Sequence, residues 1–366
     1  MLDSQTFQRL RRIGLTLPIV QQLATVAHTA AEPHLMRVTE VQRDGLTLHD
    51  GEQERRARAL PALITRLQLD SDALAVGDWV LAERNALGEY WAHARVPPQT
   101  QLARRTHDGR DKTTRLVIVS NVDTALLVMG LDHDFNLRRL ERYLALVRTA
   151  QVNAVVVLTK ADLCANAQER RDEVEAMLPM GVVALAVNAL SDDALTSLAP
   201  WLGEGQTLVL VGSSGTGKST LTNTLLGTST QDTGANRVGD NRGRHTTTSR
   251  SLHVTPSGAC IIDTPGLRNL RLDSDASAVA TTFDDITHMA LQCRFRDCKH
   301  NNEPGCAVRE AIPIERLRSF HKLLREAERD TLSAVQRKEL VQSWKARSRA
   351  TRARMQNKRG EEKSHS

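Results

Sequence analysis

Residues 212–219 have the types and spacing of a loop that binds phosphate groups. They read Gly-Ser-Ser-Gly-Thr-Gly-Lys-Ser and match G-x-x-x-x-G-K-[ST] in full. An apolar run at 207–211 precedes them and a helix-like segment at 220–226 follows, the context in which backbone N–H groups face phosphate oxygens. Lys218 would reach the β- and γ-phosphates, and the Ser219 hydroxyl would bind Mg²⁺. The predicted nucleotide contacts are Gly212, Ser213, Ser214, Gly215, Thr216, Gly217, Lys218, Ser219 and Thr220.

Two shorter motifs indicate that the nucleotide carries guanine. D-T-P-G at 263–266 follows the phosphate loop, and T-K-A-D at 159–162 precedes it. The Asp162 carboxylate would accept hydrogen bonds from the guanine N1–H and amino groups, donors that adenine does not offer there. The base-reading loop usually comes last, so the order here is permuted, which is allowed because such loops converge at the carboxyl ends of parallel strands. The predicted contacts are Thr159, Lys160, Asp162, Asp263 and Gly266.

Three of the five cysteines cluster with a histidine in the pattern C-x₄-C-x-H-x₅-C. The cluster consists of Cys293, Cys298, His300 and Cys306. Four Cys or His ligands bind Zn²⁺ tetrahedrally, so the pattern predicts a closed, structural zinc site. The alternative is three buried free cysteines beside a surface histidine. Cys164 and Cys260 lie near predicted strands, and we expect them to pack in the core.

With these motifs, residues 34–330 resemble the circularly permuted, ribosome small-subunit-dependent GTPases of the RsgA/YjeQ family. The resemblance rests on the phosphate loop, T-K-A-D, D-T-P-G and the cysteine cluster. It implies GTP and GDP as ligands, Mg²⁺ and Zn²⁺ as metal ions, and hydrolysis of GTP to GDP and phosphate. It further implies binding to the small ribosomal subunit and its 16S-type rRNA, stimulation of hydrolysis by that subunit, and a role in its late maturation.

The resemblance also assigns a catalytic switch. G-R-H-T-T-T at 243–248 would be the first switch, in which Thr247 completes the Mg²⁺ coordination. Leu267 stands where many GTPases have a glutamine that orients water. His245 is therefore the candidate for positioning the attacking water, and His245, Lys218 and Thr247 are the predicted catalytic residues. A site completed by a partner implies slow intrinsic hydrolysis.

Two positions depart from the family pattern. Thr159 stands where many members have asparagine, and its hydroxyl can still bridge to the phosphate loop. Asn188 replaces a serine in the loop that, with Ala189, would contact the guanine O6 atom. We therefore expect weaker tethering of the base-reading loop without a loss of base specificity.

The charge is concentrated at the C-terminus. The net charge is +6, but residues 337–366 alone hold ten Lys or Arg and three Glu, a net +7. Such basic arms bind RNA phosphates, although a solvated tail without a partner is the alternative. The chain shows no secretory signal and no run of 18 apolar residues, so we expect a cytoplasmic monomer that binds neither membrane nor DNA.

The expected fold is a multidomain α/β chain. Short β segments at 35–41, 46–49, 59–64, 79–83 and 90–96 suit a small barrel, and the resemblance places an OB-fold there. Helical patterns cover 5–27, 282–289 and 307–329. The expected domains are an N-terminal helical extension (1–33), an OB-fold RNA-binding domain (34–105), a circularly permuted P-loop GTPase domain (110–272), a zinc-binding helical domain (273–330) and a basic C-terminal arm (331–366).

RNA contacts of the barrel are expected to be ionic. Aromatic residues make up only 3% of the chain, and Trp79 is expected in the barrel core. The candidate RNA contacts are Arg55, Arg56, Arg58, Arg104 and Arg105, and a solvated run of charges without a partner is the alternative.

Two other functions remain open from the sequence. The phosphate loop alone would also suit an ATPase or kinase, although Asp162 argues against it. The leucine at 267 would also suit a GTP-dependent RNA-binding sensor with little hydrolysis.

Overall fold

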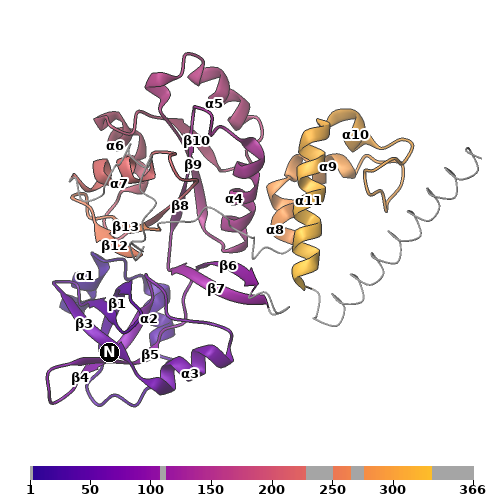
Figure 1. The fold of residues 1–366 in the computed structure, drawn as a ribbon. Coiled ribbons are helices and arrows are strands. Elements are labelled where there is room, and N and C mark those ends of the chain that lie inside the picture. Colours follow the sequence, from indigo (N-terminus) through magenta and orange to yellow (C-terminus); the bar gives the residue numbers. More distant parts are fainter. Residues whose placement is uncertain (1–2, 108–112, 228–249, 265–275, 332–366) are drawn as a thin grey trace, which may run out of the picture.

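The computed structural model describes residues 3–107, 113–227, 250–264 and 276–331. Figure 1 shows three parts: a small barrel with the N-terminal helices, a sheet flanked by helices, and a helical unit beside that sheet. Among the described residues, no helix is both long and apolar enough to cross a membrane.

The N-terminal part is a closed five-stranded barrel. Its strands are β1 His34–Val41, β2 Leu46–His49, β3 Glu54–Ala59, β4 Trp79–Arg84 and β5 Tyr90–Arg95. They pair in the order β1-β2-β3-β5-β4, and β4 pairs with β1 again, which closes the barrel. Trp79 is fully buried, but the prediction that it lies in the barrel core is wrong. It belongs to the hydrophobic cluster of Leu10 and Ile13, with the Arg37 guanidinium over its ring, whereas Val80 and Ala82 belong to the cluster inside the barrel. The expected OB-like barrel is confirmed.

One predicted barrel strand is wrong. Residues 59–64 were expected to form a strand, but the strand is β3, which ends at Ala59, and Pro61–Leu69 form helix α3. Proline at the start of α3 has a φ angle that suits a helix. The backbone N–H that proline lacks would have no hydrogen-bond partner within the helix, because it would lie in the first turn. Leu63 and Leu67, four residues apart, are buried against the barrel.

The central part is a mixed sheet between two layers of helices. Its strands are β8 Thr124–Gly130, β9 Asn153–Thr159, β10 Val183–Ala186, β11 Thr207–Val211, β12 Ser251–Val254 and β13 Cys260–Asp263. The order is β10-β9-β8-β11-β13-β12, with all neighbours parallel except β12. Every residue of β8 is buried, as expected for a central parallel strand covered on both faces.

Helices cover both faces of this sheet. They are α4 Leu137–Thr149, η1 Ala161–Leu163, α5 Ala167–Glu175, α6 Asp192–Leu198, η2 Ala199–Trp201 and α7 Lys218–Leu226. Figure 1 shows α4 and α5 on one side and α6 and α7 on the other. Alternate residues of β8 belong to different hydrophobic clusters: Leu127 shares one with Leu144 of α4, and Leu126 shares the other with Leu221 of α7.

A two-stranded hairpin follows the barrel and was not predicted. β6 Gln101–His107 pairs antiparallel with β7 Thr113–Ser120. It lies across the predicted boundary between barrel and GTPase domain, and that boundary remains a prediction. Figure 1 shows the hairpin beside the barrel and below the central sheet.

The N-terminal segment forms two helices where one helix over 5–27 was predicted. These are α1 Ser4–Arg11 and α2 Leu17–Leu23. The break contains Gly14, whose φ of +91° favours glycine, and it is followed by Pro18 in the first turn of α2. A Cβ atom on Gly14 would lie 2.1 Å from the Arg37 guanidinium. The prediction was wrong because the break is set by this tertiary contact.

Arg37 joins the barrel to the central sheet. Its side chain is fully buried, donates to the carbonyls of Ile13 and Asn121, and donates to the Thr207 hydroxyl at 3.0 Å. Burial lowers the pKa of Arg37, while the charges of Asp123 and Asp78 oppose that shift. A pairing between Glu40 of β1 and Ser251 of β12 makes the two sheets continuous. The barrel is thereby fixed against β11, the strand that precedes the phosphate loop.

The C-terminal unit packs against α4. Its helices are α8 Ala276–Thr282, α9 Asp284–Ala290, α10 Ala307–Ala311 and α11 Ile314–Thr331. The predicted helices over 282–289 and 307–329 were only partly right, since Pro313 holds Ile312 in an extended conformation and divides the second. Arg316 of α11 binds Glu141 of α4 at 2.8 Å and Asp285 of α9 at 2.7 Å, which ties the unit to the central sheet.

We predict that Arg37→Met lowers the free energy of unfolding by about 3 kcal/mol, because removing a hydrogen-bonded buried charge orphans three acceptors. Chemical denaturation followed by circular dichroism measures this. Arg56→Met, on the exposed side of β3, is the control and should cost no more than about 0.5 kcal/mol. A cost for Arg37→Met equal to that of the control would contradict the role of Arg37.

Candidate nucleotide site and metal centre

The predicted nucleotide loops lie at one edge of the central sheet. β9, β11 and β13 are parallel members of that sheet and lead into T-K-A-D, the phosphate loop and D-T-P-G respectively. Parallel strands end at the same edge, so the loops converge although their chain order is permuted. The buried Thr159 hydroxyl donates to the carbonyl of Thr216 at 2.6 Å, which is the predicted bridge between the base-reading and phosphate loops.

Glycines allow the phosphate loop to take its shape. A Cβ atom on Gly212 would lie 2.3 Å from the Val128 carbonyl oxygen, so only glycine fits against β8. Gly215 and Gly217 have φ values of +83° and +87°, in the left-handed region that favours glycine. Helix α7 begins directly after Gly217, and a helix N-terminus in this position favours the binding of an anion.

The other predicted phosphate contacts differ in their exposure to solvent. Ser213 is half-buried, Ser214 and Gly215 are exposed, and Ser219 and Thr220 are half-buried in the first turn of α7. The Lys218 ammonium donates to the Gly212 carbonyl at 2.8 Å and to the Ser213 carbonyl. Lys218 therefore already lies over the loop that it is predicted to serve.

The T-K-A-D loop presents its carboxylate to solvent. Lys160 has a left-handed backbone, with φ of +62°, and its ammonium donates to the Gly215 carbonyl at 2.8 Å. Asp162 lies in η1 and is exposed, so a base can reach its carboxylate. The base-reading and phosphate loops thus make two hydrogen bonds to each other.

Asp132 is a neighbour of Lys160 that the sequence analysis missed. Its carboxylate lies 2.6 Å from the Lys160 ammonium. Asp132 could have been identified by its position, because it follows β8 by two residues. A polar side chain there lies after a buried parallel strand, at the edge of the sheet that carries the other loops.

The loop at Asn188 is held by its own side chain and by α7. The Asn188 side-chain oxygen accepts from the Leu190 N–H at 3.0 Å. The carbonyl of Ala189 accepts from the Thr224 hydroxyl at 2.7 Å. Asparagine in place of serine thus makes a local turn, and Ala189 is buried beside the helix that follows the phosphate loop.

The remaining predicted residues divide into two groups. Asp263 ends β13, and the Thr264 hydroxyl donates to the Leu210 carbonyl at 2.9 Å, which places these first two residues of D-T-P-G beside the strand that precedes the phosphate loop. Gly266, His245 and Thr247 lie outside the described residues.

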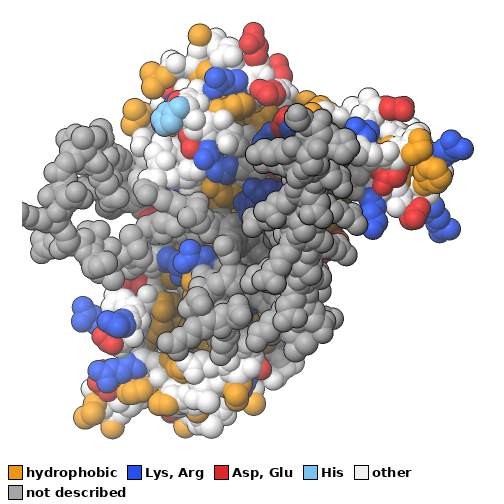
Figure 2. Space-filling model, turned by 45° about the vertical axis from the view of Figure 1, so that its right-hand side comes forward, with side chains coloured by type: hydrophobic (Ala, Val, Ile, Leu, Met, Phe, Trp, Pro, Cys, Tyr) orange, Lys and Arg blue, Asp and Glu red, His pale blue; other side chains and the backbone are white. Residues whose placement is uncertain are grey.

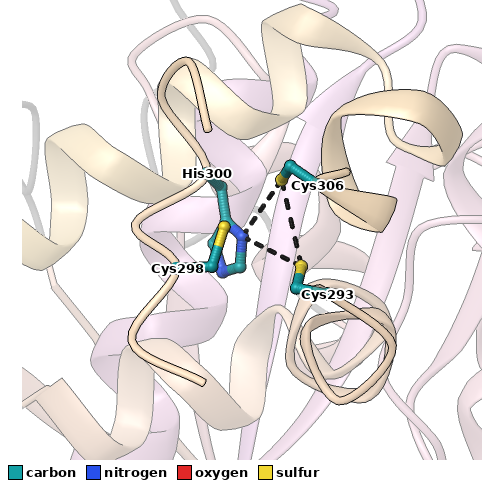
Figure 3. A group of neighbouring side chains, drawn as sticks. All are labelled: Cys293, Cys298, His300 and Cys306. Atoms are coloured by element: carbon teal, nitrogen blue, oxygen red, sulfur yellow. Dashed lines mark hydrogen bonds between the residues drawn. The ribbon is translucent and has the colours of Figure 1, made fainter. Parts of the chain in front are cut away.

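The four predicted zinc ligands come together in the C-terminal unit. Figure 3 shows Cys293, Cys298, His300 and Cys306 facing one another. One ligand atom from each lies within 4.8 Å of the other three. The Sγ atoms of Cys293 and Cys306 are 3.9 Å apart, and the His300 Nδ1 atom lies 3.6 Å and 3.5 Å from them.

These separations fit zinc. Thiolates about 2.3 Å from a tetrahedral Zn²⁺ lie about 3.8 Å apart, which matches the observed sulfur separation. Burial lowers the pKa of His300, and the nearby His321 adds to this, which favours the neutral imidazole that binds metal. The Glu303 carboxylate accepts from three backbone N–H groups of the intervening loop, which returns the chain to Cys306.

A basic groove lies on the barrel. Its volume is about 630 Å³, and its lining includes Arg55, Arg56, Arg58, Arg84 and Tyr90, so that the arginines outnumber the acidic residues, Asp44 and Glu89. The first three arginines were predicted RNA contacts, whereas Arg84 and Tyr90 were not, because β-strand pairing brings them there from a distant part of the sequence. Figure 2 shows Lys and Arg side chains spread over the other parts of the molecule as well.

We predict that the purified protein carries one structural zinc, and that Cys298→Ser loses it and unfolds the C-terminal unit, because metal binding supplies folding energy there. Elemental analysis and limited proteolysis measure metal content and folding. Cys164→Ser, outside the cluster, is the control and should retain the metal. A Cys298→Ser protein with its full zinc content and protease resistance would contradict the assignment.

The chain is similar to known proteins over most of its length. The sequence profile of RsgA GTPase matches residues 96–273. The chain is 44% identical over 311 residues to the small ribosomal subunit biogenesis GTPase RsgA of Xanthomonas axonopodis pv. citri (strain 306), covering 83% of each chain. It is 46% identical over 259 residues to the small ribosomal subunit biogenesis GTPase RsgA 2 of Vibrio vulnificus (strain CMCP6), covering 69% of this chain and 72% of that protein.

Two solved structures share the fold. YjeQ from Thermotoga maritima has a TM-score of 0.58 at 22% identity, covering 81% of this chain and 99% of that one. YloQ, described as a circularly permuted GTPase, has a TM-score of 0.55 at 21% identity, and the match covers 84% of this chain and 99% of that one. Together with the permuted motifs and the converging loops, these similarities show that the chain belongs to the RsgA family of circularly permuted GTPases.

Proposed function

We propose that this GTPase acts on the small ribosomal subunit, and that the converged loops bind GTP. The observation that carries the proposal for the site is the pair of hydrogen bonds from Thr159 and Lys160 to the phosphate loop. They hold the proposed base-reading loop beside the proposed phosphate loop, which supports the proposal that one nucleotide contacts both.

Each loop has a distinct role in this proposal. Backbone N–H groups of the phosphate loop and of the α7 N-terminus hold the phosphates, and Lys218 neutralises their charge. The Ser219 hydroxyl and Thr247 are the proposed Mg²⁺ ligands. Asp162 reads the guanine edge, while Asn188 and Ala189 lie on the loop proposed to face its O6 atom.

Hydrolysis requires that water be aligned with the γ-phosphate. Mg²⁺ would neutralise charge that develops on the phosphate oxygens. We propose that His245 positions the water and that binding of the subunit orders the switch that carries it. The adjacent D-T-P-G loop, which contains Asp263 and Gly266, is proposed to contact the nucleotide on the γ-phosphate side.

The proposed partner is the small ribosomal subunit with its 16S-type rRNA. The names of the relatives describe biogenesis of that subunit. The basic groove of the barrel and the basic arm at 331–366 supply positive charge suited to RNA phosphates. We further propose a monomeric, cytoplasmic protein that acts late in maturation of the subunit, and structural zinc at the Cys₃His cluster.

We predict that Asp162→Asn weakens GTP binding about 10- to 100-fold, because two hydrogen bonds to a charged group are lost. It should also favour xanthosine triphosphate, since the new amide can donate to the xanthine carbonyl. Equilibrium titration with both nucleotides measures the change.

Asp193→Asn is the matched control, because this exposed carboxylate lies on α6 in the same domain. It should leave both affinities unchanged. Retained preference for GTP in Asp162→Asn would contradict the base-reading assignment.

We predict that purified small ribosomal subunits stimulate GTP hydrolysis and that large subunits do not. His245→Ala should lower the stimulated rate at saturating GTP while leaving GTP affinity nearly intact, because the residue is proposed to act on water alone.

Arg56→Glu with Arg84→Glu should weaken subunit binding in sedimentation assays, since both side chains are exposed and line the groove.

The outcomes separate the parts of this proposal. Equal stimulation by both subunits would contradict the partner. An unchanged stimulated rate in His245→Ala would remove that residue from the mechanism. Negligible hydrolysis with every ribosomal partner would favour a GTP-dependent RNA-binding sensor.

A further inference from the structure

The Lys160 ammonium is held between two oxygens of different loops. It donates to the Asp132 carboxylate at 2.6 Å and to the Gly215 carbonyl at 2.8 Å. The two side chains, 30% and 28% exposed, are open to solvent only in part. The side chain of Lys160 therefore reaches from the base-reading loop to the phosphate loop, where its ammonium group is held by both contacts.

The Asp132 carboxylate is itself oriented by the backbone around it. Its Oδ1 atom accepts from the Asp134 N–H at 2.9 Å, while its Oδ2 atom faces the Lys160 ammonium at 2.6 Å and the Nδ1 atom of the exposed His133 ring at 3.6 Å. The Leu131 N–H donates to the Thr159 carbonyl at 3.0 Å, so the chain before Asp132 is paired with the chain before Lys160. The geometry of the ion pair is thus set by main-chain contacts at both of its ends.

The missing side chain of Gly130 leaves room for this carboxylate. A Cβ atom on Gly130 would lie 2.7 Å from Asp132 Oδ1, so glycine at the end of β8 permits the turn. Burial raises the pKa of Asp132, but the hydrogen bonds from Lys160 and the Asp134 N–H and the charge of Lys160 outweigh it, and the net shift is downward. Asp132 is therefore charged at neutral pH.

Lys160 needs such support because its backbone is unfavourable. A non-glycine residue with φ of +62° costs about 1–3 kcal/mol, and such conformations persist where surrounding contacts fix them. A lysine side chain also has many rotamers to lose when it is held against a ligand. Fixing it before the ligand arrives lowers the cost of binding.

We propose that Asp132 is a positioning residue for guanine-nucleotide affinity, holding Lys160 extended along the plane that the base occupies. This inference rests on the proposed nucleotide site. Asp132 acts on the base end of the site, remote from the γ-phosphate. Its loss therefore weakens GTP and GDP equally and leaves the hydrolysis rate at saturating GTP unchanged.

The test compares Asp132→Asn, Lys160→Ala and the double variant by calorimetric titration with GDP and with a non-hydrolysable GTP analogue. Asparagine retains the acceptor for the Asp134 N–H and removes the charge. We expect Asp132→Asn to weaken both affinities by about fivefold, the upper range for a partly exposed ion pair. The effect should disappear in the Lys160→Ala background, which a general structural role would not produce.

Asp134→Asn is the matched control, because this carboxylate of the same turn pairs with Arg139 at 2.7 Å. It should leave both affinities unchanged. Equal affinity of Asp132→Asn and the wild type would overturn the proposal, and so would an undiminished effect in the Lys160→Ala background.

Failure of the underlying site has a different signature. If Asp162→Asn keeps its preference for GTP and Lys160→Ala binds like the wild type, the base is read elsewhere and both proposals fall. If Asp162→Asn shifts the preference while Asp132→Asn binds normally, only the role of Asp132 is overturned.

Discussion

The hydrogen bond between the Thr159 hydroxyl and the Thr216 carbonyl joins two loops on which the nucleotide site depends. The loops are 57 residues apart and occur in the reverse of the usual order. They meet because β9 and β11 are parallel members of one buried sheet and therefore end at the same edge. A circular permutation changes which loops are consecutive in the chain, but it leaves this edge intact.

The other two parts of the molecule are attached by buried or half-buried arginines. Arg37 links the barrel and the N-terminal helices to the start of β11. Arg316 links α11 to α4, and Arg142 of α4 binds Glu326 of α11 at 2.7 Å. Buried charged contacts of this kind fix the relative position of the parts more reliably than they raise the free energy of unfolding, because each charge must first be removed from water. They hold a basic groove and a Cys₃His cluster in defined positions relative to the nucleotide loops.

Local sequence patterns predicted the features that local chemistry controls. The phosphate loop was predictable because it needs glycine at Gly212, Gly215 and Gly217, and the metal cluster because four ligands lie close in sequence. A short apolar run such as 59–64 does not by itself distinguish a strand from a helix, and the proline at 61 favours the first turn of a helix.

Contacts between distant residues could not be read from the sequence. The break at Gly14 makes room for Arg37, a residue distant in sequence. The pairing of β6 with β7 was not predicted, because the residues of the two strands are of mixed polarity. The contact between Asp132 and Lys160 depends on the pairing of β8 with β9. The sequence indicated the type of site, and the sheet determined which side chains support it.

Displacement of labelled GTP from the purified wild-type protein would show whether the permuted loops form one guanine-nucleotide site. GDP should displace the label at near-stoichiometric excess, while ATP at large excess should not, because adenine lacks the donors that Asp162 accepts from. Equal displacement by ATP would mean that the loops do not read guanine and would favour a P-loop ATPase or kinase.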